Sequence, residues 1–297
     1  MVKIPVRTTH AYGLIAATVL TWAIGVVIAR AVHQEIPPIG LSFWRWIIAT
    51  LILLPFIWRS LRQNIQLVIK NLGYFWVQGI FMTGGGMFLF LAVNFTTAIN
   101  VALVNATQPI LTVLIAWILI RDEIKSIQIL GIVAAFIGIT VMVTKADFRV
   151  LVNLDFNVGD FITVLATAFY ACYAINIRKM PKEIGTFTAL FVILLMGSLT
   201  LFPFYMAEAV FIRPTPFSGK LVIVVLVLAL LVSILSLAMW NTGNAVVGHN
   251  RAAIFVNLMP VYSAILAIYF LDERLYFFHV IGALFVCAGI FMVVRKD

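Results

Sequence analysis

An internal repeat with an offset of about 150 residues is the feature that most constrains the fold of this 297-residue chain. Prolines and glycines recur at an offset of 151 (109 to 260), and an Asp-Glu pair recurs at 150 (122 to 272). The matched residues are Pro109 and Pro260, Gly131 and Gly282, Gly138 and Gly289, and Asp122-Glu123 and Asp272-Glu273. Each copy carries five hydrophobic spans. Because five is odd, a second copy that begins where the first one ends enters a membrane from the opposite side. The sequence therefore predicts an inverted repeat.

Composition places most of this chain in lipid. Hydrophobic residues make up 64% and charged residues 10% of the sequence, and the mean hydropathy is +1.12. Soluble domains are about 45–50% apolar and roughly 25% charged. We therefore expect an all-α integral membrane protein whose helices cross the bilayer in about 20 residues each. The net charge of +9 is spread over the span ends, so we expect membrane lipid as a partner and no nucleic acid.

The hydrophobic pattern predicts ten transmembrane helices as two inverted five-helix repeats, residues 1–150 and 151–297. The predicted spans are 11–32, 39–58, 72–95, 98–120, 126–144, 160–178, 185–206, 220–243, 251–271 and 276–294, and the polar segment 145–159 links the halves. Thirteen Lys and Arg fall on the side of the termini and six on the other side. This bias predicts a multi-pass protein of the plasma (inner) membrane with both termini cytoplasmic.

The acidic residues lie away from the middle of the membrane. Each of the eleven is in a loop, at a terminus or at the end of a span. This distribution argues against a deep proton relay and against a membrane-embedded enzyme, which would need acid and base groups that face a cavity. The four histidines show no metal-ligand spacing. We therefore predict no catalytic residue, no metal and no cofactor.

Pro109 and Pro260 lie near the middle of the fourth and ninth spans. A proline inside a helix removes one backbone hydrogen bond and clashes with the carbonyl four residues earlier, here that of Asn105 or Val256. A single proline of this kind most often marks a packing kink. Kinks at matched positions near the midplane instead favour a binding site, because secondary transporters build their sites from interrupted helices at equivalent depth.

Polar and aromatic residues on several spans are expected to converge near these prolines. Interhelical hydrogen bonding explains any one polar stripe equally well. Convergence of several stripes instead favours a neutral, amphipathic lining, which suits small organic molecules better than inorganic ions. The predicted substrate-binding residues from these stripes are Trp22, Gln78, Met82, Asn105, Gln108, Tyr170, Trp240 and Asn257.

Arg45 is the one charged residue well inside a span. It lies seven residues, or roughly 10 Å at 1.5 Å per residue, from the outer end of its span. Its side chain could snorkel or pin a neighbouring carbonyl. Alternatively, its guanidinium could attract the carboxylate of a substrate. No acidic partner is available within the spans, and we therefore add Arg45 to the predicted binding residues.

Glycines mark the predicted packing faces. Gly131 and Gly138 in the fifth span, with Gly282 and Gly289 in the tenth, would let two backbones approach closely. We assign these two spans to the scaffold or to contact within a homodimer. The triplet Gly84-Gly85-Gly86 in the third span permits either close packing or bending.

Each half resembles an EamA-type repeat of the drug/metabolite transporter superfamily. The motifs that carry the resemblance are Pro109 to Arg121-Asp122-Glu123, Gln128, Gly131 and Gly138, and Pro260 to Asp272-Glu273-Arg274, Gly282 and Gly289, supported by Thr21-Trp22-Ala23, Phe43-Trp44-Arg45 and Phe169-Tyr170-Ala171. The chain has Asp-Glu where the family pattern usually has Gly-Glu. The resemblance implies ten helices, cytoplasmic termini, a central cavity and movement of amino acids or related metabolites, usually outward. It also implies that Gln108, just before the proline, can face the substrate.

We therefore expect a secondary transporter of small amphipathic metabolites, in the first place an amino-acid exporter that works by alternating access. Without an acid at the midplane, we expect facilitated diffusion or exchange rather than strict proton symport. Two alternatives stay open. One is a transporter of nucleotide-sugars, organophosphates or drug-like compounds, and the other is a membrane protein that transports nothing.

Overall fold

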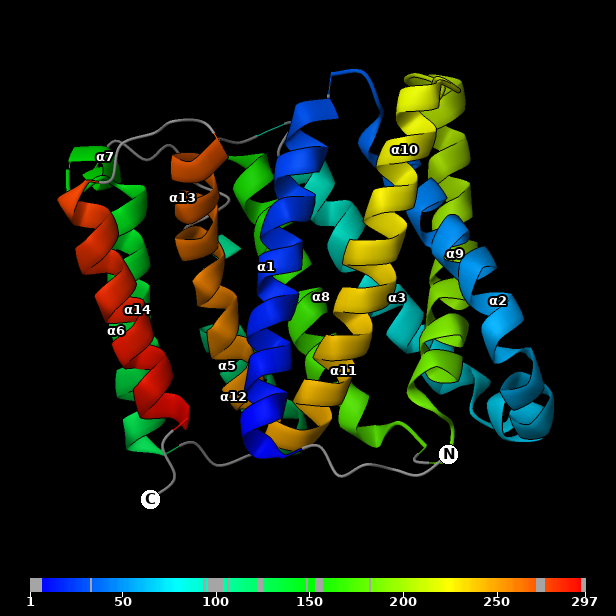
Figure 1. Ribbon diagram of the computed structural model, residues 1–297, viewed down its shortest axis with the longest axis horizontal. Coiled ribbons are helices and arrows are strands. Elements are labelled where there is room, and N and C mark those ends of the chain that lie inside the picture. The colour runs from blue at the N-terminus through cyan, green and yellow to red at the C-terminus, as the bar shows by residue number, and fades with distance from the viewer. Residues whose placement is uncertain are drawn as a thin grey trace.

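The computed structural model describes residues 7–32, 34–92, 95, 104–105, 107–121, 125–147, 149–152, 157–181, 183–270 and 276–294. Their regular structure is helical throughout, which confirms the predicted all-α fold (Figure 1). The longer helices are α1 (Thr8–Val32), α2 (Pro38–Lys70), α3 (Leu72–Ala92), α5 (Gln108–Ile120), α6 (Ser126–Val143), α8 (Val158–Asn176), α9 (Thr186–Phe211), α10 (Gly219–Val227), α11 (Ser236–Val247), α13 (Leu258–Phe270) and α14 (Phe277–Val294). The shorter ones are α7 (Arg149–Val152), α12 (His249–Ala253), the 3₁₀-helices η1 (Ile177–Lys179) and η3 (Ile254–Asn257), and the π-helix η2 (Leu228–Leu235).

Several of these helices are suited to a bilayer. Among the described residues, five segments are long and apolar enough to cross a membrane: Pro38–Lys70, Leu72–Ala92, Val158–Lys179, Thr186–Phe211 and Gly219–Val247. The apolar helices Gln108–Ile120, Ser126–Val141 and Val280–Val294 are shorter. Large apolar side chains cover the outside of the molecule, such as Phe56 at 82% and Phe211 at 84% exposure. These faces need an apolar solvent, which lipid supplies.

Some boundaries differ from the sequence prediction. α2 continues twelve residues past the expected end at 58, through two arginines, to Lys70. This extension is amphipathic rather than a loop: Val68 packs into the core, whereas Ile69 is 62% exposed. The eighth predicted span continues to Val247 and contains η2. Asp122-Glu123 and Asp272-Glu273 lie outside the described residues.

Equivalent helices of the two halves pack against each other in opposite directions. Gly131 of α6 meets Gly289 of α14, and Gly138 meets Gly282. A Cβ added to Gly131 or Gly138 would lie 2.6 Å from the carbonyl oxygen of its partner. In the sequence repeat, Gly131 corresponds instead to Gly282, so α6 and α14 cross about a local two-fold axis. These glycine faces are covered within the chain, and a homodimer would have to use another surface.

The other helices also make contacts between the two halves. α2 and α9 are antiparallel, since Gly40 lies near Glu208 and Ser60 bonds to Thr188. α1 packs on α11, and α3 packs on α8. In Figure 1, α6 and α14 form one edge of the bundle, and α2 and α9 form the opposite edge. The start of α1 and the end of α14 lie at the same end of the bundle.

Gly138→Val should destabilise the fold, because the new side chain would collide with the backbone of α14 at the glycine contact. Overpacking of this kind costs roughly 1–3 kcal/mol. Thermal unfolding of the purified protein in detergent measures the effect. Gly13→Val on α1 is the matched control, since a Cβ there meets nothing within 4 Å. Equal melting temperatures for the two variants would contradict the packing described here.

Candidate functional site

A central cavity lies among α1, α2, α3, α8, η2 and the breaks in the two proline-bearing spans. Its volume is about 70 Å³, measured as space open to the centres of water molecules. One water needs on the order of 10–15 Å³ of such space, so the cavity can hold several waters or a small organic group. Six of the predicted binding residues line it: Trp22, Arg45, Met82, Asn105, Gln108 and Tyr170. Trp240 lines a smaller pocket that shares four residues with this cavity.

Both proline-bearing spans are interrupted beside the cavity. In the fourth span, residues 104–105 are helical, Thr107 is in a turn, and α5 begins at Gln108. In the ninth span, η3 separates α12 from α13, which begins at Leu258. Pro109 and Pro260 therefore lie in the first turn of a new helix, where a missing N–H has no helical partner to lose. The α-helical hydrogen-bond pattern thus stops just before each proline: at a turn on Thr107 in the fourth span, and at the 3₁₀-helix η3 in the ninth, where the path from His249 to Phe270 remains helical.

The two breaks contribute equivalent positions to the cavity. Asn105 and Gln108 match Val256 and Met259 at the offset of 151, and all four residues line the cavity. The Nδ2 atom of Asn105 lies 4.0 Å from the Sδ atom of Met259. The repeat offset identifies Val256 and Met259 from the sequence, although their apolar side chains carry no signal of a binding site. The first half thus supplies two carboxamides where the second half supplies apolar groups.

The aromatic wall is held by α1 and α11. The Trp22 indole Nε1 donates a hydrogen bond to the Ser236 hydroxyl at 3.1 Å, and the Trp22 and Trp240 ring centroids are 5.0 Å apart. Val232 of η2 lies against Gly25, where a Cβ would be 2.7 Å from a Val232 methyl carbon. π-Helical turns often mark functional sites. Nothing in the sequence pattern of this apolar segment predicts one.

The glycine triplet makes room for the opposite wall. α3 remains helical through Gly84, Gly85 and Gly86, so the triplet serves close packing rather than bending. A Cβ on Gly85 would lie 3.0 Å from the Tyr170 ring. A Cβ on Gly86 would lie 3.3 Å from the Arg45 Nη2 atom and 3.4 Å from the Tyr170 hydroxyl oxygen. Small residues on α3 thus bring the guanidinium and the phenol to the cavity.

Arg45 is buried, with 4% of its surface exposed. Its guanidinium carbon lies 4.1 Å from the Trp46 ring centroid and 5.2 Å from that of Phe90, and both rings also line the cavity. The structure records no hydrogen bond or ion pair of Arg45 within the described part of the chain, and its Nε atom has no partner. The side chain is therefore enclosed and does not snorkel to the surface. Trp46 and Phe90 were not among the predicted residues, although Trp46 directly follows Arg45.

Two predicted residues lie outside the lining. Gln78 is buried in a polar layer beside the cavity, where its amide nitrogen is 3.4 Å from both the Tyr74 hydroxyl and the Tyr173 carbonyl. In the same layer the Tyr173 hydroxyl donates to the Asn241 Oδ1 atom at 2.8 Å. Asn257 is 1% exposed and follows Val256 in η3, and neither atom of its amide has a hydrogen-bond partner. Among the residues the structure describes, no group of three or more His, Cys, Asp or Glu could hold a metal ion.

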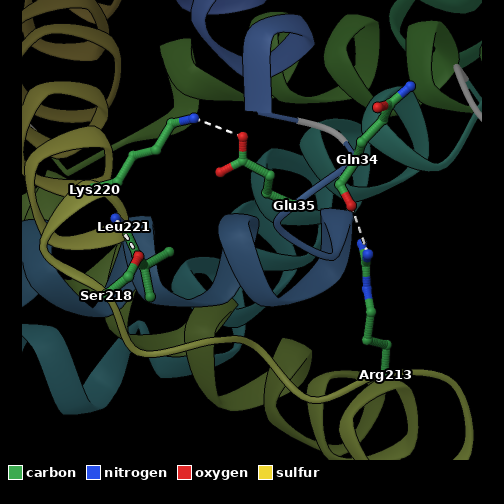
Figure 2. A network of polar contacts seen from close by, with 6 residues as sticks. All are labelled: Gln34, Glu35, Arg213, Ser218, Lys220 and Leu221. Atoms are coloured by element: carbon green, nitrogen blue, oxygen red, sulfur yellow. Dashed lines mark hydrogen bonds and ion pairs between the residues drawn. The ribbon is translucent and has the colours of Figure 1, made fainter.

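At the end of the bundle opposite the helical termini, two contacts join the α1–α2 loop to the α9–α10 connection and to the first turn of α10 (Figure 2). The Lys220 ammonium lies 2.6 Å from the Glu35 carboxylate, and the Arg213 guanidinium donates to the Gln34 carbonyl at 2.6 Å. Ser218 caps α10 by accepting the N–H of the third residue of that helix. We call these two contacts the loop clasp. The Lys220 and Glu35 side chains are 53% and 56% exposed, and an exposed pair of this kind contributes only about 0–1 kcal/mol.

Known proteins share this architecture and sequence. The sequence profile of the EamA-like transporter family matches twice, at residues 9–144 and 157–295. The chain belongs to this family. A solved crystal structure with 17% identity shares the fold, with a TM-score of 0.75 over 96% of each chain.

Individual relatives of this EamA-like protein are transporters by name. An "uncharacterized transporter" of Archaeoglobus fulgidus is 25% identical over 96% of this chain and 97% of its own length. A "probable amino-acid metabolite efflux pump" of Escherichia coli K12 is 24% identical over 92% of this chain and 91% of its own length. These matches confirm the predicted family and place the chain among membrane transporters rather than enzymes.

Tyr173→Phe should destabilise the polar layer, because it leaves the buried Asn241 Oδ1 atom without its donor. An unsatisfied buried acceptor costs about 1–3 kcal/mol, whereas removal of both partners is nearly neutral. The double variant Tyr173→Phe/Asn241→Leu should therefore be more stable than Tyr173→Phe alone in thermal unfolding. If the losses of melting temperature in the single variants Tyr173→Phe and Asn241→Leu simply add in the double variant, the hydrogen bond does not stabilise this layer.

Proposed function

We propose that this protein is a secondary transporter of small amphipathic metabolites, namely amino acids or related compounds, and that it works by alternating access. The observation that carries the proposal is the cavity between the helix breaks of the two repeats. Helix breaks leave backbone groups that lipid cannot satisfy, so they occur where they border a cavity or are buried in protein. Transporters with inverted repeats place their substrate at such breaks.

The cavity and its surroundings suggest roles for six of the nine predicted residues. Trp22, Tyr170 and Trp240 supply flat apolar walls for the body of the substrate. The Asn105 and Gln108 carboxamides, on the side of the first half, orient its polar groups. Asn257 holds a buried amide without a partner next to the lining, and we assign it a polar contact that forms when η3 rearranges.

The proposed topology has ten membrane spans in two inverted repeats, with both termini cytoplasmic in the plasma membrane. The Lys and Arg bias of the sequence supports this orientation. In this topology the loop clasp lies at the outer end of the bundle. Its contacts are exposed and individually weak, which suits a closure that must open in each transport cycle.

Asn105→Ala and Gln108→Ala should each raise the KM for transport of an amino acid or related metabolite by roughly two- to tenfold, the equivalent of one lost hydrogen bond. Uptake into proteoliposomes of the purified variants measures this effect. Gln63→Ala is the control, because Gln63 is an exposed carboxamide on α2. If all three variants transport like the wild type while remaining folded, the assigned roles of Asn105 and Gln108 are wrong.

Glu35→Lys should open the loop clasp, because it places two ammonium groups where an ion pair now lies. Hydrogen exchange of residues 34–41 and 213–221 in nanodiscs should become faster. The swapped double variant Glu35→Lys/Lys220→Glu should restore slow exchange. Exchange that is unchanged in the single variant would show that the pair does not hold these loops together.

A further inference from the structure

The cavity carries one unbalanced positive charge. Arg45 lines it, and none of the carboxylates that the structure describes, those of Glu35, Asp147, Asp160, Glu183 and Glu208, belongs to its lining. A buried charge without a counter-ion is costly. The ring faces of Trp46 and Phe90 offset only part of this cost. A ligand that brings one negative charge supplies what the protein lacks.

The lining also has more hydrogen-bond donors than acceptors near this charge. The Arg45 Nε and Trp46 Nε1 atoms are buried donors without acceptors. A carboxylate accepts hydrogen bonds and fits a guanidinium in a bidentate geometry. The rest of the lining is largely apolar, with Met82, Val232, Val256 and Met259 around the aromatic rings. The cavity is therefore built for an anionic head with an apolar body.

A zwitterionic amino acid is poorly complementary in charge to this cavity. When its carboxylate faces Arg45, its ammonium group, one carbon away, lies close to the guanidinium and is repelled by it. The Asn105 and Gln108 amide oxygens can accept from an ammonium but cannot neutralise it. A phosphate dianion, in turn, would need a second cation, and no other Lys or Arg lines the cavity among the described residues.

Building on the transport function proposed above, we infer that the preferred substrate is an organic monocarboxylate with an apolar body and no ammonium group on the carbon next to the carboxylate. Branched 2-oxo acids are of this class. They have the carbon skeleton of an apolar amino acid and a keto oxygen in place of the ammonium group. The substrate then carries one negative charge that matches the single charge of Arg45.

The test compares two compounds that differ only at this position, 4-methyl-2-oxopentanoate and leucine, as labelled substrates of the full chain in proteoliposomes at pH 7. For the wild type, we expect a KM at least tenfold lower for the oxo acid. Arg45→Gln should abolish this preference. Arg62→Gln is the control. Arg62 also stacks on a tryptophan of α2, with its guanidinium carbon 4.8 Å from the Trp58 ring centroid. Because Arg62 is exposed and does not line the cavity, its replacement should leave the preference unchanged.

The outcomes separate the two proposals. Leucine transported as well as or better than the oxo acid, or a preference that survives in Arg45→Gln, would overturn the monocarboxylate assignment and leave the transport function standing. If Arg45→Gln fails to fold, the wild-type comparison alone decides. Inhibition by 3-methylbutyl phosphate as strong as that by the oxo acid would also overturn the assignment. If neither compound nor any member of an amino-acid panel is taken up, the proposed function itself is wrong.

Discussion

A hydrocarbon environment offers no hydrogen bonds to the backbone, and this constraint organises the whole molecule. Every N–H and C=O group within the bilayer must find a partner inside the protein, and an α-helix provides one for each group within a single segment. Wherever a helix stops, its unpaired backbone groups must be shielded by protein or face enclosed water. The breaks before Pro109 and Pro260 meet this requirement because they lie between the two halves, beside the central cavity. The cavity therefore lies where the α-helices of the fourth and ninth spans are interrupted.

The repeat brings equivalent positions together and then gives them different chemistry. Asn105 and Gln108 face the cavity from one side, and their counterparts Val256 and Met259 face it from the other. Arg45 has no charged counterpart across the local two-fold axis: at the offset of 148 that relates Trp22 to Tyr170, the second half has Ile193, a fully buried core residue. The polar and charged groups that line the cavity therefore come mainly from the first half. In the proposed transport cycle, this asymmetry of the side chains would give the substrate one orientation.

Much of this arrangement could be predicted from the sequence, since in a membrane protein the hydrophobic pattern and the repeat constrain the fold strongly. The all-α fold, the contact between the glycine faces of α6 and α14, and six of the fourteen residues that line the cavity follow from them. A proline alone does not fix the geometry of the helix that contains it. Pro55 and Pro203 lie inside continuous helices, whereas Pro109 and Pro260 lie in the first turn of helices that begin at breaks. Pro55 and Pro203 are exposed on the outer faces of α2 and α9. The π-helix η2 could not be predicted, because its valines and leucines are compatible with any helical hydrogen-bond pattern.

Transport through this cavity requires that water reach the two helix breaks from both sides of the membrane. Accessibility of single cysteines tests it directly, after Cys172 and Cys287, the two native cysteines, have been replaced. Cysteines at positions 108 and 259 should react with a membrane-impermeant thiol reagent from either side of the membrane, and substrate should protect both. A cysteine at position 284, where Leu284 is 65% exposed on the outer face of α14, should react slowly because lipid covers it. Reaction at 108 and 259 no faster than at 284 would contradict a water-filled site between the repeats.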